Sequence, residues 1–108
     1  PSAATVGAWW GPVPDDEYPG MRRTREGEVG IVAYEGKRLV LAGEAKWSAG
    51  PERGDALAQL RATVIHVPGY ADDTTRLVLY TRSGFDGRFR REAESQGIIL
   101  RTVDDLYR

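Results

Sequence analysis

The sequence predicts an α/β domain in which strands and helices follow in the order β-β-β-α-β-α-β. Two apolar segments, residues 28–34 and 38–47, flank Glu35-Gly36-Lys37, and a glycine in such a position favours a tight turn between antiparallel strands. After residue 47, segments with helical periodicity alternate with short apolar strands, which is typical of parallel strands joined by helices. A length of 108 residues fits one domain, residues 1–108, with one modest core.

The N-terminal part is predicted to hold one short strand and a long connection. Residues 3–10 are apolar and end in two tryptophans, so we expect a strand there. Residues 11–27 contain three prolines and many charges, which predicts a long loop or an extended hairpin connection. Acidic residues come first in this segment, followed by Arg22, Arg23 and Arg25.

The C-terminal half is predicted from its periodicity. Apolar residues recur at helical spacing up to Pro68-Gly69, which would end the helix: Leu57, Leu60, Val64 and Val67. A polar linker (70–75) and a strand (76–82) follow. Ser83 or Asp86 can cap a second helix that Gly97 ends. Residues 98–102 predict a last strand and residues 103–107 a closing helical turn.

The composition excludes several classes of function. A net charge of −1 gives no overall attraction to nucleic acid, so any such contact must come from a local patch. Without cysteine there can be neither a thiolate zinc site nor a cysteine nucleophile, and a single histidine disfavours histidine-built sites. No apolar run approaches a membrane span, so we expect a cytoplasmic protein without a membrane partner.

Strict alternation along residues 38–47 places a carboxylate and an ammonium on one face of an otherwise apolar strand. Val40, Ala42, Glu44 and Lys46 are expected to point one way, and Leu39, Leu41, Gly43, Ala45 and Trp47 the other. Burying such charges costs free energy unless they pair, bind a metal or line a cleft. Glu44 and Lys46 are therefore the candidate catalytic residues.

An acidic residue on one strand followed by E-x-K on the next is the metal site of restriction-endonuclease-like nucleases. Two carboxylates hold Mg²⁺ and the lysine orients a metal-bound water or stabilises charge on the scissile phosphate. Glu44 and Lys46 match E-x-K, with Glu44 as metal ligand, but the facing position holds Gly30. Glu28, about 6.5 Å further along the strand, is a second candidate ligand, too distant for a simple replacement. Magnesium is expected only if the site is active, and Gly30 argues against an enzyme.

Three segments, G-E-V-G-I-V-A, L-V-L-A-G-E-A-K-W and L-V-L-Y-T-R-S-G-F, resemble a C-terminal domain of unknown function in archaeal and bacterial AAA-type ATPases. That family is similar to the PD-(D/E)xK nuclease superfamily. The resemblance implies a restriction-endonuclease-like mixed sheet with flanking helices, and a single nuclease-like domain cut from a longer ATPase, whose remaining chain is the expected partner. The family usually has an aspartate at the position that Gly30 occupies in this chain. The chain contains no G-x-x-x-x-G-K-[ST] motif, so it is not expected to bind ATP.

Three functions remain open at this stage. The leading prediction is a nuclease-like accessory domain with a degenerate metal site, and an active Mg²⁺-dependent DNA endonuclease is the alternative. The third is a non-catalytic docking or DNA-binding module, for which Arg22, Arg23 and Arg25 are the candidate phosphate contacts and DNA the partner. Gln59 is a further polar candidate for the E-x-K face. The tryptophans, such as Trp10, could stack on bases, although packing in the core or at the sheet edge is favoured.

Overall fold

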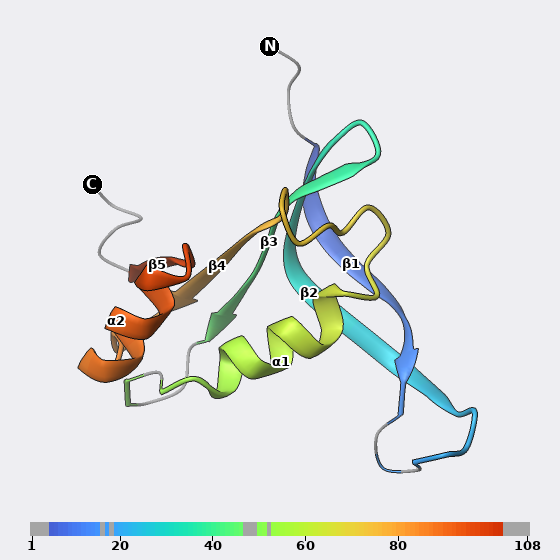
Figure 1. The fold of residues 1–108 in the computed structure, drawn as a ribbon, viewed down its shortest axis with the longest axis horizontal. Helices are drawn as coiled ribbons and strands as arrows, with labels where there is room; N and C mark the ends of the chain where they lie inside the picture. Colours follow the sequence, from blue (N-terminus) through green and yellow to red (C-terminus); the bar gives the residue numbers. More distant parts are fainter. Residues whose placement is uncertain (1–4, 16, 18, 47–49, 52, 103–108) are drawn as a thin grey trace.

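A computed structural model describes residues 5–15, 17, 19–46, 50–51 and 53–102. Its elements follow the predicted order β-β-β-α-β-α-β (Figure 1). They are β1 (Thr5–Pro14), β2 (Thr24–Glu35), β3 (Arg38–Lys46), α1 (Asp55–Val64), β4 (Arg76–Thr81), α2 (Gly87–Ser95) and β5 (Ile99–Thr102). The expected closing turn at residues 103–107 lies outside the described residues, as does Trp47.

The five strands form one mixed sheet in the order β1-β2-β3-β4-β5. The β1–β2 and β2–β3 pairs are antiparallel, whereas the β3–β4 and β4–β5 pairs are parallel. The predicted mixed sheet is therefore confirmed. Its antiparallel part comes from the β1–β2 hairpin and from the β2–β3 hairpin around Gly36, and its parallel part from two helical crossovers.

Both helices cover the same face of the sheet (Figure 1). This follows from the topology, because two successive right-handed crossovers toward the same edge place their helices on one side. The main core lies between the helices and this face. It joins Leu60 of α1 and Phe89 of α2 to Val29 of β2 and Leu79 of β4 in one apolar cluster.

Of the two alternatives predicted for residues 11–27, the extended hairpin connection agrees with the structure and the long loop is wrong for most of the segment. β1 continues to Pro14 and β2 begins at Thr24, so the two strands form a hairpin that projects beyond α1 (Figure 1). We call its outer part, residues 10–14 and 24–28, the β1–β2 arm. Pro12 and Pro14 are tolerated because β1 is an edge strand, where a missing N–H breaks no ladder bond toward a further strand.

Strict alternation along β3 is also wrong at one point. The β2–β3 register shifts between Ala33 and Tyr34, with Ala33 opposite Leu41 and Tyr34 opposite Leu39. The extra residue, Val40, is a β-bulge, and it turns Leu39 into the same core as Ala42. Beyond the bulge the alternation resumes, so the side chains of Glu44 and Lys46 lie on the same face of the sheet.

The second helix begins and ends as the sequence predicts. The Asp86 carboxylate accepts a hydrogen bond from the Phe89 N–H at 3.1 Å, so Asp86 rather than Ser83 is the cap. Gly97, in the left-handed region at φ 79°, donates its N–H to the Glu94 carbonyl and ends the helix. Within the described part of the chain, neither helix is long and apolar enough to span a membrane.

Candidate functional site

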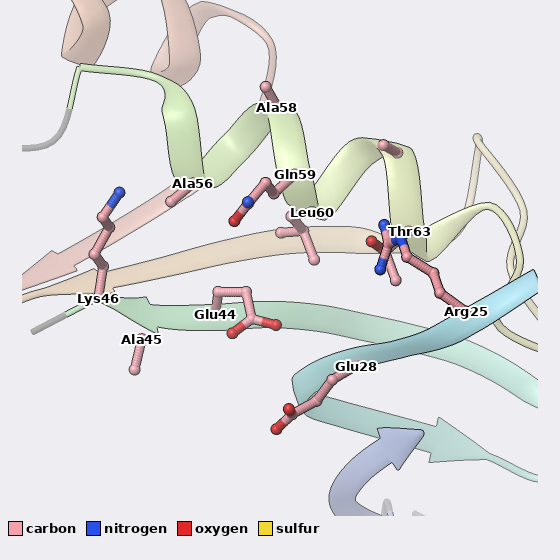
Figure 2. Close-up of a pocket in the computed structure, with 11 residues that line it drawn as sticks. Arg25, Glu28, Glu44, Ala45, Lys46, Ala56, Ala58, Gln59, Leu60 and Thr63 are labelled. Carbon is pink, nitrogen blue, oxygen red and sulfur yellow. The ribbon is translucent and has the colours of Figure 1, made fainter. Parts of the chain in front are cut away.

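The candidate site lies where β2 and β3 separate. Their pairing runs from the turn as far as Ile31 opposite Gly43; beyond that pair, β2 continues beside β1 and β3 beside β4. Helix α1 crosses over the opening, and a pocket of about 760 Å³ lies between the three elements (Figure 2). The fork in the sheet thus provides a concave space beside the end of β3 that carries E-x-K.

The pocket is lined from all three elements, and several of its α1 residues are small. Alanines leave room for the pocket because their side chains end at Cβ. The lining residues are Arg25, Glu28, Glu44, Ala45, Lys46, Ala56, Ala58, Gln59, Leu60, Ala62 and Thr63.

The carboxylate of Glu44 turns toward β2 and is held by a backbone donor. The Gly30 N–H donates to Glu44 Oε1 at 2.9 Å. This N–H is available because β2 carries a bulge here: the β1–β2 register moves from Gly7 opposite Val32 to Trp9 opposite Val29, so β2 has one extra residue. The bulge therefore positions Glu44, and this donor was not predicted from the sequence.

The missing side chain of Gly30 faces the same carboxylate. A Cβ at Gly30 would lie 3.2 Å from Glu44 Oε2 and 3.8 Å from Oε1, and its three nearest contacts all belong to the carboxyl group of Glu44. The backbone of Gly30 is not in the left-handed region, so it does not require glycine. The predicted juxtaposition of Gly30 with Glu44 is thus present in the structure.

The environment of Glu44 favours its protonated form. Partial burial is the largest cause and raises the pKa of Glu44 above its ordinary value, while the hydrogen bond from Gly30 acts in the opposite direction. The negative charge of Glu28 adds a smaller upward contribution to the same pKa. Glu44 is therefore a half-buried carboxylate with a second carboxylate nearby, an arrangement that would attract a cation.

The positively charged side chains reach the pocket from different sides. Lys46 and Glu44 both line it, but in Figure 2 the ammonium of Lys46 points away from the carboxylate of Glu44. Arg25 extends from β2 toward Thr63 of α1. Gln59 extends from α1 toward β3 and lines the same pocket.

The three candidate arginines separate in the structure. Arg25 lies on β2 and lines the pocket, whereas Arg22 and Arg23 precede β2 and are not among the lining residues. All three side chains are exposed. The structure therefore brings one of the proposed phosphate contacts to the Glu44 pocket and leaves two at the hairpin turn.

The described side chains do not complete the two-carboxylate magnesium site of the motif, because position 30 on β2 has no side chain. Among the described residues, no group of three or more acidic, histidine or cysteine side chains comes together as a metal site. Among the described residues that line the pocket, Glu44 and Glu28 are the only ones with carboxylates, and one oxygen of Glu44 accepts the Gly30 N–H. Mg²⁺ prefers octahedral oxygen coordination, and a carboxylate at position 30 would supply the missing ligand.

No match to the chain is found among protein-family models, curated proteins or solved structures. What the pocket can do therefore follows from its own side chains and their geometry.

Proposed function

We propose that this chain is a nuclease-like accessory domain whose metal site is incomplete, so that it does not cleave nucleic acid in its present form. The single observation that carries the proposal is the vacant Cβ position of Gly30, 3.2 Å from the carboxylate of Glu44, in the pocket that Lys46 also lines. Glu44 and Lys46 of an E-x-K site are present. Gly30, the position at which β2 would add a carboxylate, has no side chain.

The fold is compatible with this proposal at the level of topology. An antiparallel hairpin continues into two parallel strands, and the E-x-K residues lie at the end of the central strand β3. With the sequence resemblance, this supports a restriction-endonuclease-like domain attached to an AAA-type ATPase, which would place it in the cytoplasm. Glu44 and Lys46 then mark the former metal end of the site.

The alternative of an active Mg²⁺ nuclease requires Glu28 to replace the missing ligand. Glu28 is close enough to raise the pKa of Glu44, and it lines the same pocket. However, Figure 2 shows its side chain extending from β2 away from α1, while Arg25 extends toward α1. No side chain at position 30 adds a ligand beside Glu44, so this alternative depends on Glu28 alone as the second carboxylate.

Restoring the carboxylate tests the proposal directly. Gly30→Asp should raise the affinity for Mn²⁺ and Mg²⁺ by about tenfold or more, because it adds an oxygen ligand beside Glu44. Isothermal titration calorimetry measures this gain. Gly30→Asn has the same shape without the charge and is the matched control, and the double variant Gly30→Asp with Glu44→Ala should lose the gain.

Plasmid cleavage in Mg²⁺ or Mn²⁺ distinguishes an inactive nuclease-like domain from an active nuclease. The parent protein should leave the plasmid intact. If the parent cleaves, and Glu44→Ala and Lys46→Ala both abolish cleavage, the domain is an active nuclease and the proposal is wrong. If Gly30→Asp gains no metal affinity over Gly30→Asn, the assignment of Gly30 to the metal site fails.

A further inference from the structure

The outer side of β1 carries an exposed row of apolar residues, none of which lines the pocket. Trp9 of β1 packs against the main core and Val13 is buried on the same face of the strand, so the residues between and beside them turn to the other face. Val6 is 69% exposed and Trp10 is 56% exposed. We call this row the outer stripe; all of its members are exposed, and they are Val6, Ala8, Trp10, Pro12 and Pro14.

Two carboxylates accompany the outer stripe on the neighbouring strand. Trp10 lies opposite Glu28 and Pro12 opposite Glu26 in the antiparallel β1–β2 pair. Side chains of directly opposed residues lie on the same face, with Cβ atoms about 5 Å apart. The face therefore combines an apolar row with a parallel acidic row, and both glutamates are exposed.

We propose that the outer stripe is a docking surface for an amphipathic helix of another protein, with an apolar face bordered by lysine or arginine. Charge complementarity selects this occupant, because Glu26 and Glu28 would attract a basic flank and repel phosphates. A second copy docked through the same face would bring like charges together, and DNA would meet two carboxylates beside Trp10.

The dimensions of the face suit a helix. Val6 and Pro14 are eight residues apart on one strand, which corresponds to about 27 Å and to about 18 residues of α-helix. Glu26 and Glu28 are about 6.6 Å apart along β2, close to the spacing of about 6 Å between side chains at i and i+4 of a helix. One helix can therefore place its apolar residues on the outer stripe and two basic side chains at the glutamates.

Pro12 and Pro14 favour face docking over strand addition at this edge. Proline has no N–H to give to an incoming strand, so the outer half of β1 cannot extend the sheet. Trp10 would then be the central anchor, because a large exposed aromatic side chain loses little conformational entropy when it is covered.

The probe is an 18-residue leucine/lysine peptide that contains no tryptophan and has leucines on one helical face. The same peptide with glutamate in place of lysine is the charge control. Binding to the full chain is measured by calorimetry and by tryptophan fluorescence. We expect the leucine/lysine peptide to bind, and Trp10→Ser or Glu26→Lys to weaken it about tenfold or more.

Matched variants lie on the other side of the molecule. Ile65 is 56% exposed, like Trp10, and Glu94 lies on α2, so Ile65→Ser and Glu94→Lys should leave peptide binding unchanged. All these positions are at the surface, so the variants should keep the parent's cooperative unfolding.

Four outcomes would overturn the proposal. They are no binding of the leucine/lysine peptide, equal binding of the leucine/glutamate peptide, binding unaffected by Trp10→Ser, and a stronger effect of Ile65→Ser than of Trp10→Ser. Two further measurements exclude the other occupants. Sedimentation equilibrium showing a dimer that Trp10→Ser dissociates would assign the face to a second copy, and binding of oligo(dT) that Trp10→Ser abolishes would assign it to single-stranded DNA.

Discussion

Gly43 on β3 and Gly30 on β2 lie near each other on facing strands, yet the structure needs only one of them. A Cβ at Gly43 would overlap the backbone oxygen and Cγ1 of Val78 on the adjacent strand β4. The three nearest atoms to a Cβ at Gly30 would all belong to the carboxyl group of Glu44, at the end of a side chain. Gly43 is therefore explained by packing against the backbone of β4, whereas a Cβ at Gly30 requires only a small shift of the Glu44 carboxylate.

The same contrast separates two polar groups near these strands. The hydroxyl of Thr75 is buried, donates to the Leu39 carbonyl at 2.7 Å and accepts the Ala71 N–H at 3.1 Å. Its bonds join the linker before β4 to the bulged part of β3. Glu44 is half-buried and lines a pocket, in an environment that raises its pKa. We therefore expect the two groups to differ in how much their removal changes the free energy of unfolding.

The largest expected effect is that of Gly43→Ala. A methyl group at this position must displace the backbone of β4, so we expect a loss of about 3 kcal/mol in the free energy of unfolding. Gly30→Ala is the matched variant and should cost less than about 0.5 kcal/mol, because alanine also restricts the unfolded chain. Urea unfolding measures both values. Equal losses in the two variants would break the distinction between the glycines.

Thr75→Val tests the polar group on the structural side of the comparison. Valine keeps the shape of threonine but leaves the Leu39 carbonyl and the Ala71 N–H without this partner in a buried place, so we expect a loss of about 2 kcal/mol. Thr75→Ser keeps the hydroxyl and should lose less than the valine variant. A valine variant as stable as the parent would show that the two hydrogen bonds contribute nothing net.

The order of the elements could be predicted because each element has a clear periodicity. The β2–β3 hairpin follows from Gly36, the α1 stripe from Leu57 and Leu60, and the α2 cap from Asp86. Strand β1 was predicted too short because its prolines suggested a loop, and a sequence does not show that a strand will lie at the edge of its sheet. Thr75 was assigned to a polar linker, since a buried hydroxyl with two partners has no local sequence signal.

The candidate site was predictable where it depends on spacing within one strand. Glu44 and Lys46 reach the same pocket because two residues along a strand return to the same side. The bulge at Gly30 and Ile31, which delivers the N–H to Glu44, depends on the register between strands and could not be read from either strand alone. For the same reason, the sequence could not separate Arg25 from Arg22 and Arg23.

Glu44→Gln should give the smallest change in the free energy of unfolding. This change should be an increase, whereas Thr75→Val should give a decrease. Burial and the charge of Glu28 raise the pKa of Glu44 in the folded protein above the ordinary value of 4.5, so the native state holds this proton more tightly than the unfolded chain. The contribution of Glu44 to stability is then complete below pH 4.5 and is lost as the pH rises through the raised pKa. Glutamine does not titrate, and it retains an oxygen that can accept the Gly30 N–H.

The free energy of unfolding of the Glu44→Gln variant should therefore exceed that of the parent by more at pH 7 than at pH 3. Because Glu44 is half-exposed, the difference in unfolding free energy between the two pH values should stay below about 1 kcal/mol. Urea unfolding of parent and variant across this range measures it, and Glu28→Gln should reduce the difference by removing the neighbouring charge. A glutamine variant that is relatively less stable at pH 7 than at pH 3 would mean that ionised Glu44 supports the fold, and Gly30 and Glu44 would then belong with Gly43 and Thr75 as structural residues.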